Sequence, residues 1–308
     1  MEKQDGTATT VVTPGNHDGV HRGHRALLDE ARRLATPIGA SVTALSFHPH
    51  PAEVLAPERA PAILTPIERR RELLLGRGAD VVEVLTFDRA LSSEAPESFV
   101  ERVLVNQLHA RAVVIGADFR FGKGAKGDVA LLRQMGPDSG FTVSVLEAVE
   151  VDGSRVSSSR VRAALVDGDI ELATRLLGRV HDVSGEVVLG HQRGRTIGVP
   201  TANLDVRGVL MPTDGVYAVI ARVGEQLISG VANLGVRPTV EAGRSTEVHL
   251  LDFDRDLYGQ TLRVGFVARL RGETKFDGLD ALKAQIKRDI ADAERALAAA
   301  DRETWTWM

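Results

Sequence analysis

The first half of the chain alternates short apolar runs with stretches of helical period. Five runs are apolar nearly throughout rather than alternating, as expected of strands that are covered on both faces. These runs span residues 11–13, 41–47, 81–87, 112–116 and 141–147. Helical patterns lie between them, at about residues 23–35, 66–76, 96–108 and 127–136. Strand–helix alternation predicts an α/β doubly wound parallel sheet, which binds ligands at the carboxyl ends of its strands.

The pattern changes after two more helical stretches at about 158–166 and 169–177. Short strand-like runs separated by Gly, Pro, Asn and Asp then follow. They span residues 183–190, 216–223, 227–233, 246–253 and 261–268. Evenly spaced strands without helices between them predict a small antiparallel β-barrel, and an amphipathic helix near 279–299 follows it. We therefore predict two domains, residues 1–178 and 179–308.

The helix predicted near residue 66 carries two local signals. Thr65 is a candidate N-cap, with Pro66 at the first helical position and Glu68 three residues after the cap. The three arginines at 69–71 are most simply a solvated face of this helix.

Composition and charge exclude several classes of protein. The 308 residues are 43% hydrophobic and 26% charged, as in a globular protein and unlike a disordered or collagen-like one. The chain has no cysteine, which excludes disulfides, thiolate zinc sites, iron–sulfur clusters and cysteine nucleophiles. It has no apolar run near the ~18 residues of a membrane span and no signal-peptide core. With a net charge of -4 and a pI near 6.2, it is predicted to be cytoplasmic, without nucleic-acid or membrane partners. A homo-oligomer stays open.

A glycine-rich turn with two histidines follows the first predicted strand, where residues 15–24 read GNHDGVHRGH. Gly15 permits a tight turn and close approach of a ligand. His21 and His24 are three residues apart and can lie side by side at a helix start, which attracts anions. Two imidazoles there suit a polyphosphate whose charge grows in the transition state. The alternatives are a surface role and a zinc site, for which no third ligand stands nearby.

Two further segments of the first half favour phosphate binding. Residues 155–162 read RVSSSRVR before a predicted helix, where hydroxyls cap the helix or bind phosphate and Arg162 can contact phosphate in a bidentate manner. An ordinary N-cap with exposed arginines is the plainer interpretation. Residues 116–122, GADFRFG, follow the fourth strand, where a doubly wound sheet binds its ligand.

The second half contains its own candidate site. Residues 194–203 read GRTIGVPTAN, which does not match the Walker pattern. A threonine hydroxyl and an asparagine amide oxygen can nevertheless hold a phosphate-bound Mg²⁺. Glu247 lies on an alternating strand and can accept a hydroxyl proton if it points into the barrel mouth. A hairpin loop and a solvent-facing acid are the alternatives for these two features.

Together these motifs resemble the bifunctional prokaryotic riboflavin kinase/FAD synthetases, from about Val11 to Leu297. The first half is similar to the adenylyltransferase module in the three segments above and in LLGR at 176–179. The second half is similar to the riboflavin kinase module in six segments. These are GRTIGVPTAN (194–203), GVYAV (215–219), GVANLGVRPT (230–239), EVHLLDF (247–253), DLYG (256–259) and LRGETKF (270–276). The order of the motifs across both modules makes the resemblance specific.

The resemblance implies two ATP-dependent reactions: phosphorylation of riboflavin to FMN, and adenylylation of FMN to FAD with release of pyrophosphate. It implies that His21 and His24 stabilise the α-phosphoryl transition state and that Glu247 is the base for the flavin 5′-hydroxyl. It also implies that Thr201 and Asn203 ligate Mg²⁺ and the ATP phosphates. The other binding residues that we expect are Gly15, Asn16, Asp18, Asp118, Arg155, Ser158, Ser159, Arg162, Gly194, Arg195, Gly198 and Arg271.

Four residues depart from the family's pattern. His17 stands where Phe is common, His48 where an acid is frequent, Ser159 in place of Thr and Val199 in place of Phe. The two histidines leave open a riboflavin kinase whose first module binds nucleotide but is inactive. A non-catalytic flavin-binding regulator is a second alternative. A tRNA-charging enzyme is a third, although the chain has no Lys-Met-Ser-Lys-Ser segment.

Overall fold

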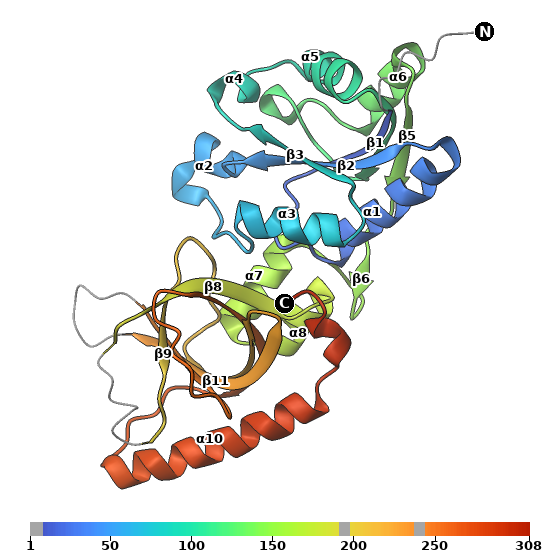
Figure 1. Ribbon diagram of the computed structural model, residues 1–308. Helices are drawn as coiled ribbons and strands as arrows, with labels where there is room; N and C mark the ends of the chain where they lie inside the picture. The colour runs from blue at the N-terminus through green and yellow to red at the C-terminus, as the bar shows by residue number, and fades with distance from the viewer. Residues whose placement is uncertain (1–8, 191–197, 237–243) are drawn as a thin grey trace. The chain divides into compact units, whose positions relative to one another are not determined.

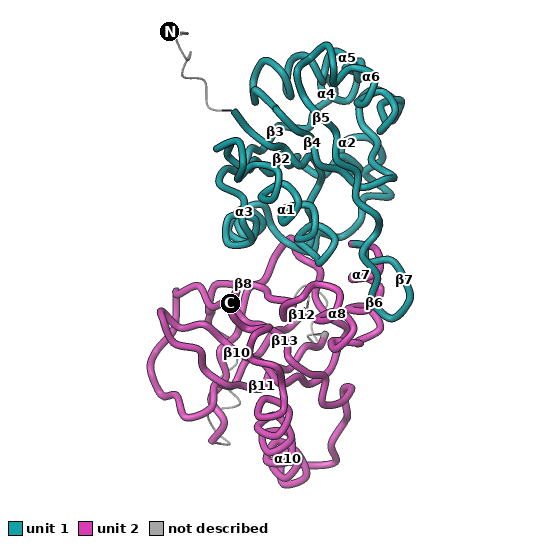
Figure 2. The backbone as a smooth tube through the Cα atoms, turned by 90° about the vertical axis from the view of Figure 1, so that its right-hand side faces the viewer, with its two compact units in different colours: residues 1–157 teal, residues 158–308 magenta. Residues whose placement is uncertain are grey.

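The computed structural model describes residues 9–190, 198–236 and 244–308. The chain divides into two compact units, residues 1–157 and 158–308 (Figure 2). This division groups the helices between residues 158 and 177 with the barrel. Our predicted boundary at 178/179 stays a prediction. Among the described residues, no helix is both long and apolar enough to cross a membrane.

A five-stranded parallel sheet forms the first unit, as the alternation predicts. Its strands are β1 (Thr10–Pro14), β2 (Ser41–His48), β3 (Val81–Thr86), β4 (Ala110–Gly116) and β5 (Thr142–Leu146). Their order in the sheet is β3-β2-β1-β4-β5, so the direction of winding reverses between β1 and β4. Sheets of this type bind ligands outside the carboxyl ends of the strands at such a reversal. The loops after β1 and β4 therefore flank the expected site.

Helices cover both faces of this sheet (Figure 1). The helices α1 (Arg22–Ala35) and α3 (Ile67–Gly76) lie on one face. The other face carries α5 (Pro96–Phe99), the π-helix η3 (Val100–Gln107) and α6 (Val129–Ser139). Shorter elements are η1 (Thr36–Ile38), α2 (Pro51–Leu55), η2 (Pro57–Arg59), α4 (Arg89–Ser92), η4 (Lys123–Ala125), β6 (Glu150–Val151) and β7 (Ser154–Arg155). The core on the second face packs η3 side chains against β1 and β4.

The helix predicted at 96–108 is confirmed, as a short α-helix that continues directly into a π-helix. Two other local predictions in this unit are wrong. Pro66, not Thr65, is the N-cap of α3, because Pro66 has an extended backbone with ψ 154°. Arg70 is 2% exposed and is therefore not part of a solvated face. Its side chain turns under the loop that follows β1, as described below.

The second unit is built on a closed antiparallel barrel, also as predicted. The barrel order is β10-β11-β12-β9-β8-β13. Its strands are β8 (His181–Val188), β9 (Ala202–Asp205), β10 (Gly215–Val223), β11 (Gln226–Val236), β12 (Arg244–Leu250) and β13 (Thr261–Arg271). The sequence pattern missed β9, because its four residues ANLD include two polar ones. Pairing of β9 with both β8 and β12 is what closes the barrel.

Helices flank this barrel on its outside. The helices α7 (Ser158–Asp167) and α8 (Ile170–Leu177) precede it, and α10 (Leu279–Ala299) and η5 (Arg302–Trp305) follow it. Ala293 and Leu297 of α10 pack on the outer wall with Ala218 and Ile220. Leu279, at the amino end of α10, is exposed. A cavity lies between the following turns of this helix and the barrel.

Candidate functional site

The loop between β1 and α1 brings the predicted histidine pair together. His21 is the N-cap of α1, and its Nδ1 accepts a hydrogen bond from the backbone N–H of His24 at 3.4 Å. The two rings stack with 3.7 Å between centroids and 11° between planes. Gly23 makes room for this, because a Cβ there would lie 3.1 Å from the ring of His21. Both imidazoles therefore stand at the N-terminus of α1, where unpaired N–H groups favour anions.

A buried ion pair between Asp18 and Arg70 supports the loop between β1 and α1. Asp18 is 2% exposed, and its carboxylate accepts hydrogen bonds from the backbone N–H groups of Leu64 and Thr65. Nη2 of Arg70 lies 3.5 Å from Asp18, and Nη1 donates to the carbonyl of Asn16 at 2.8 Å. A buried charge is tolerated only when it is paired and hydrogen-bonded, as here. In this structure Asp18 shapes the loop, and its predicted contact with substrate stays a prediction.

The side chain of Asn16 contacts a second histidine. Its amide group lies 3.3 Å from Nε2 of His50, whose Nδ1 accepts from the backbone N–H of Ala52. Because Nδ1 accepts, neutral His50 carries its proton on Nε2, and Asn16 must present its oxygen to it. Gly15 lies between this contact and β1 and is half-buried. His48 is exposed at the end of β2.

Burial keeps His17 and His24 neutral at neutral pH. Desolvation, with Arg70 and His21 adding to it, lowers the pKa of His17 from 6.5 to about 3. The pKa of His24 is also lowered well below 6.5, by burial first and then by His21, His17 and Arg70. At neutral pH each of these two rings therefore carries a single proton. His24 can donate a hydrogen bond to a phosphate only through the nitrogen that holds it.

Acid is expected to destabilise the first unit through these two histidines. Their pKa values are lower in the folded chain than the ordinary 6.5 of an unfolded one, so the unfolded chain binds more protons and stability falls below pH 6.5. While the pH lies between its two pKa values, each histidine contributes a slope of about 1.4 kcal/mol per pH unit. Urea unfolding between pH 7.5 and 5 should therefore show that the free energy of unfolding of the first unit falls less steeply with decreasing pH in His17→Phe than in the wild type. Equal slopes would contradict a buried neutral His17.

The other predicted residues of the first half fall into two groups. Asp118, in the loop after β4, pairs with Nη2 of Arg155 at 2.7 Å, and both side chains are more than half exposed. The structure thus joins two predicted residues beside the reversal of the sheet. Ser158, Ser159 and Arg162 lie in the first two turns of α7, within the second unit. Their contact with nucleotide stays a prediction.

The barrel unit holds a cavity of about 350 Å³ between its wall and α10. Glu247 of β12 and Thr201 line it, and Asn203 is paired directly opposite Glu247 in the sheet register. Paired residues point to the same side of a sheet, so Asn203 belongs to this face as well. Glu247 therefore points out of the barrel toward α10 and not into the barrel mouth. Ser245 donates a hydrogen bond to Glu247 Oε1 at 3.2 Å.

The rest of this cavity is largely apolar. Arg271 lines it and forms a two-point ion pair with Asp289, at 2.9 and 2.8 Å, which ties β13 to α10. Val199, one of the departures from the family's pattern, also faces the cavity. Its apolar lining consists of Val216, Val231, Phe276, Leu282, Ile286 and Ile290. Such a space suits a flat, mostly apolar ligand held by a few polar groups.

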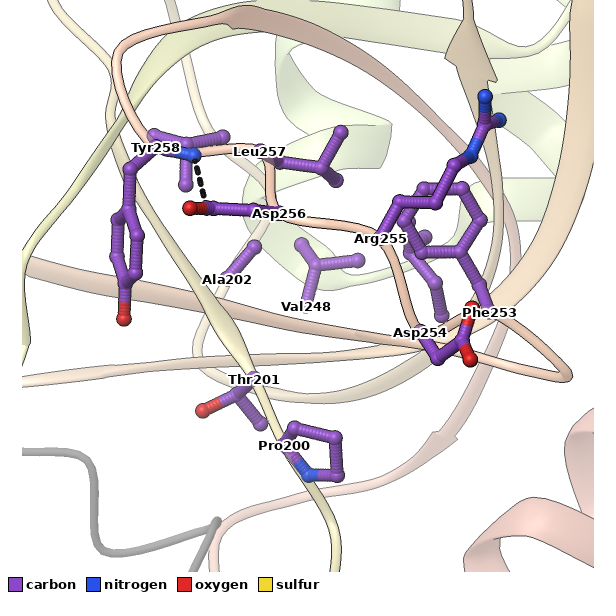
Figure 3. A pocket seen from close by; sticks show the side chains of 12 residues that line it. Pro200, Thr201, Ala202, Val248, Phe253, Asp254, Arg255, Asp256, Leu257 and Tyr258 are labelled. Carbon is purple, nitrogen blue, oxygen red and sulfur yellow. Dashed lines mark hydrogen bonds between the residues drawn. The ribbon is translucent and has the colours of Figure 1, made fainter.

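A second cavity, of about 340 Å³, opens on the other side of Thr201 (Figure 3). Val187, Ala202 and Val248 line its floor, and the loop 253–258 lines its rim. Asp254 and Asp256 carry carboxylates there, and Asp256 Oδ1 accepts from the backbone N–H of Tyr258 at 3.0 Å. Thr201 lines both cavities. It therefore marks the place where ligands in the two spaces can meet.

Sequence reasoning missed His249 as a residue of this site. His249 lines the cavity of Glu247, and its Nδ1 donates to the carbonyl of Pro200 at 2.7 Å, just before Thr201. The period of two along β12 could have found it, because residues 247 and 249 share a face. Gly198 is exposed with φ 80°, a left-handed conformation that glycine adopts readily. Gly194 and Arg195 lie outside the described residues.

The donor set of the barrel site fits a magnesium ion bound with phosphate. Thr201 supplies a hydroxyl and Asn203 an amide oxygen, which are hard oxygen ligands, and Mg²⁺ takes its other ligands from phosphates and water. Among the described residues, no group of three or more histidine, aspartate or glutamate side chains could hold a metal alone. The histidine pair at 21 and 24 therefore does not extend to a three-ligand zinc site there.

Comparisons with known proteins match most of the chain, in both units. A family model of FAD synthetase matches residues 3–160, and a model of riboflavin kinase matches residues 177–297. The chain is 44% identical over 291 residues to a bifunctional riboflavin kinase/FMN adenylyltransferase of Pseudomonas fluorescens, covering 94% of this chain and 93% of the relative. Relatives of the same description in Escherichia coli K12 and Bacillus subtilis are 43% and 35% identical, each covering at least 90% of both chains.

A solved structure shares the fold. It is a crystal structure described as a macrolide-efflux protein from Streptococcus pneumoniae, 30% identical, with a TM-score of 0.86. The match covers 95% of this chain and 96% of that one. The same succession of elements is thus found in an experimental structure.

Proposed function

The chain belongs to the family of bifunctional riboflavin kinase/FMN adenylyltransferases, and from this we propose which residues serve each reaction. The riboflavin kinase half phosphorylates riboflavin to FMN with ATP. The FAD synthetase half transfers AMP from ATP to FMN, which gives FAD and pyrophosphate. The two activities use separate sets of side chains.

We propose that the cavity beside α10 holds the flavin and that the cavity in Figure 3 holds ATP. The observation that carries this assignment is that Thr201 lines both spaces. The apolar lining beside α10 suits the flavin rings. Asp254 and Asp256 repel phosphate and suit the ribose hydroxyls, so the phosphates extend toward Thr201.

Glu247 then acts as the base of the kinase reaction. It lines the flavin cavity, and Ser245 holds one of its carboxylate oxygens. As the flavin 5′-hydroxyl attacks the γ-phosphorus of ATP, the carboxylate accepts the hydroxyl proton. Thr201 and Asn203 would hold Mg²⁺, which would neutralise phosphate charge. His249 fixes Pro200 and so positions the backbone that carries Thr201.

In the first half, His21 and His24 contact the α-phosphate of ATP. They stand at the N-terminus of α1, and His24 is a neutral hydrogen-bond donor. The FMN phosphate attacks the α-phosphorus, and the charge that grows on the phosphoryl oxygens is stabilised by the N–H groups of the helix start and the imidazoles. Neither histidine needs to become a nucleophile. Asp118 and Arg155 form an exposed ion pair. Asp118 follows β4 at the carboxyl end of the sheet, the same end as the loop between β1 and α1, and the pair positions the substrates.

A time course with riboflavin, ATP and Mg²⁺ tests the order of the two reactions. FMN should appear first and FAD after it, with one pyrophosphate released for each FAD, because FMN is the substrate of the second transfer. Chelation of Mg²⁺ should stop FMN formation, which depends on the ion at Thr201 and Asn203. FMN that forms at an undiminished rate in excess chelator would exclude this ion. Product separation by chromatography and a pyrophosphate assay supply both readings.

A further inference from the structure

His17 is a completely buried polar side chain for which the mechanism above has no use. It is 0% exposed, and neither ring nitrogen has a hydrogen-bond partner of good geometry; a weaker contact with the backbone of Gly15 only partly offsets the effect of burial on its pKa. Burial of an unpaired polar atom is costly, and a phenyl ring of similar shape would avoid this cost. An imidazole retained here points to a partner that it meets in another state of the site.

His24 offers the matching unpaired atom. Its Nδ1 is buried without a hydrogen-bond partner. The rings of His17 and His24 meet edge to face, with 5.1 Å between centroids and 66° between planes. Two imidazoles joined by one N–H···N hydrogen bond of ~2.9 Å have centroids about 5 Å apart, so a rotation of the rings is enough to form the bond.

Two other side chains near these rings have partners of their own. His21 stacks on His24, and its Nδ1 accepts from the His24 backbone. The terminal nitrogens of Arg70 donate to the carbonyls of Asn16 and Thr65 and pair with Asp18. His17, whose ring meets that of His24, is the nearest described imidazole with a nitrogen available for His24 Nδ1.

We propose that His17 is a positioning residue for His24, donating a hydrogen bond to His24 Nδ1 when the phosphates of ATP bind at His24 Nε2. A neutral imidazole whose Nδ1 accepts must carry its proton on Nε2. His17 thus selects the tautomer in which His24 can donate to the α-phosphate. The inference rests on the proposed contact between His24 and ATP.

The charge state of both rings agrees with this role. The pKa of His17 is lowered to about 3, chiefly by burial, so His17 stays neutral and has one N–H to donate throughout the range in which enzymes are assayed. The lowered pKa of His24 means that its tautomer, and not its total charge, decides whether Nε2 can donate. Orientation by a second group is the usual way in which a histidine tautomer is chosen.

Two substitutions at position 17 separate this role from simple packing. His17→Phe keeps the shape of the ring and removes both nitrogens. His17→Asn keeps an N–H donor and suits the left-handed backbone at this position, where φ is 51°. We expect kcat for FAD formation to fall about tenfold in His17→Phe with the KM for ATP nearly unchanged, and to recover at least half of that loss in His17→Asn. FMN formation in both variants should equal that of the wild type.

The tautomer itself is read by ¹⁵N NMR of the histidine rings with α,β-methylene-ATP bound. The His24 signals, assigned by comparison with His24→Asn, should show the proton on Nε2 in the wild type. In His17→Phe they should show a mixture of both tautomers. An Nδ1-protonated His24 in the wild type, or the same His24 spectrum in both proteins, would overturn the proposal.

A parallel assay of His24→Ala distinguishes failure of the contact between His24 and ATP from failure of the role of His17. If His24→Ala loses FAD formation while His17→Phe keeps its full rate, the contact of His24 with ATP stands and the role of His17 fails. If His24→Ala itself forms FAD normally, the proposed site fails and the role of His17 fails with it. Binding of α,β-methylene-ATP to each variant shows whether the nucleotide site is still formed.

Discussion

Replacing His24 with alanine is expected to lower FAD formation from FMN by about a hundred- to a thousandfold while FMN formation from riboflavin continues at the wild-type rate. The imidazole stands at the N-terminus of α1, stacked on His21. In the proposed mechanism it donates to the phosphoryl group whose charge grows during transfer. Loss of one such transition-state contact costs ~3–4 kcal/mol, or about a hundred- to a thousandfold in kcat. Chromatographic assay of FAD and pyrophosphate from FMN and ATP measures the loss.

His109→Asn is the matched control for His24→Ala. This histidine belongs to the same unit but precedes β4, at the amino end of the strands and away from the proposed site. Its φ of 48° is compatible with asparagine, so the backbone should not change. The control should form FAD at the wild-type rate. Retention of FAD formation by His24→Ala, or loss of FMN formation together with it, would contradict the assignment.

Replacing Glu247 with glutamine is expected to produce the opposite result. The amide keeps the size of the side chain and can still accept the hydrogen bond from Ser245, but it cannot accept a proton. Removal of a general base typically costs about 10²–10⁴-fold in rate. FMN formation should fall by this factor, whereas FMN supplied from outside should still be converted to FAD. Initial rates of FMN and FAD formation, measured separately, supply the comparison.

Glu225→Gln controls for the loss of one negative charge in the barrel unit. Glu225 lies at the turn between β10 and β11, and its side chain is 97% exposed. This variant should keep both activities. If Glu247→Gln forms FMN at the wild-type rate, Glu247 is not the base. If it also loses conversion of added FMN while the barrel unit stays folded, the two activities do not use separate residues.

Most of the fold was predictable because burial leaves a strong pattern in the sequence. The strands of the first unit are apolar nearly throughout and alternate with helices, and this pattern predicts the parallel sheet. The barrel strand β9 escaped prediction because its sequence, ANLD, is short and half polar. Its place is decided by pairing with β8 and β12, which are distant in sequence. Pairing of this kind leaves no local signal.

The candidate site was predictable in part. The stacking of His21 on His24 follows from their spacing at a helix start, and the structure places them as expected. The burial of Arg70 does not follow from its sequence, because a run of three arginines usually faces solvent. Arg70 is buried because Asp18 and the carbonyl of Asn16 lie above the first turn of α3. Such contacts join residues that are about 50 positions apart.

The direction of the side chains in the barrel was decided in the same way. Alternation along β12 separates Glu247 and His249 from Val248 but does not say which face is outside. Closure of the barrel and the packing of α10 decide it: Val248 is buried, and Glu247 faces the cavity beside the helix. The two cavities that meet at Thr201 also exist only in the folded chain.

The amino-acid sequence by itself determined the two-unit architecture, the chemistry of both candidate sites and the family to which they are similar. These properties depend on residue types and on spacings within single turns or strands, which are local. The tertiary structure alone decided that Arg70 and Asp18 support the histidine loop, that His17 lies against His24, and that Glu247 faces α10. Each of these contacts depends on which distant segments pack together, and packing is a property of the whole chain.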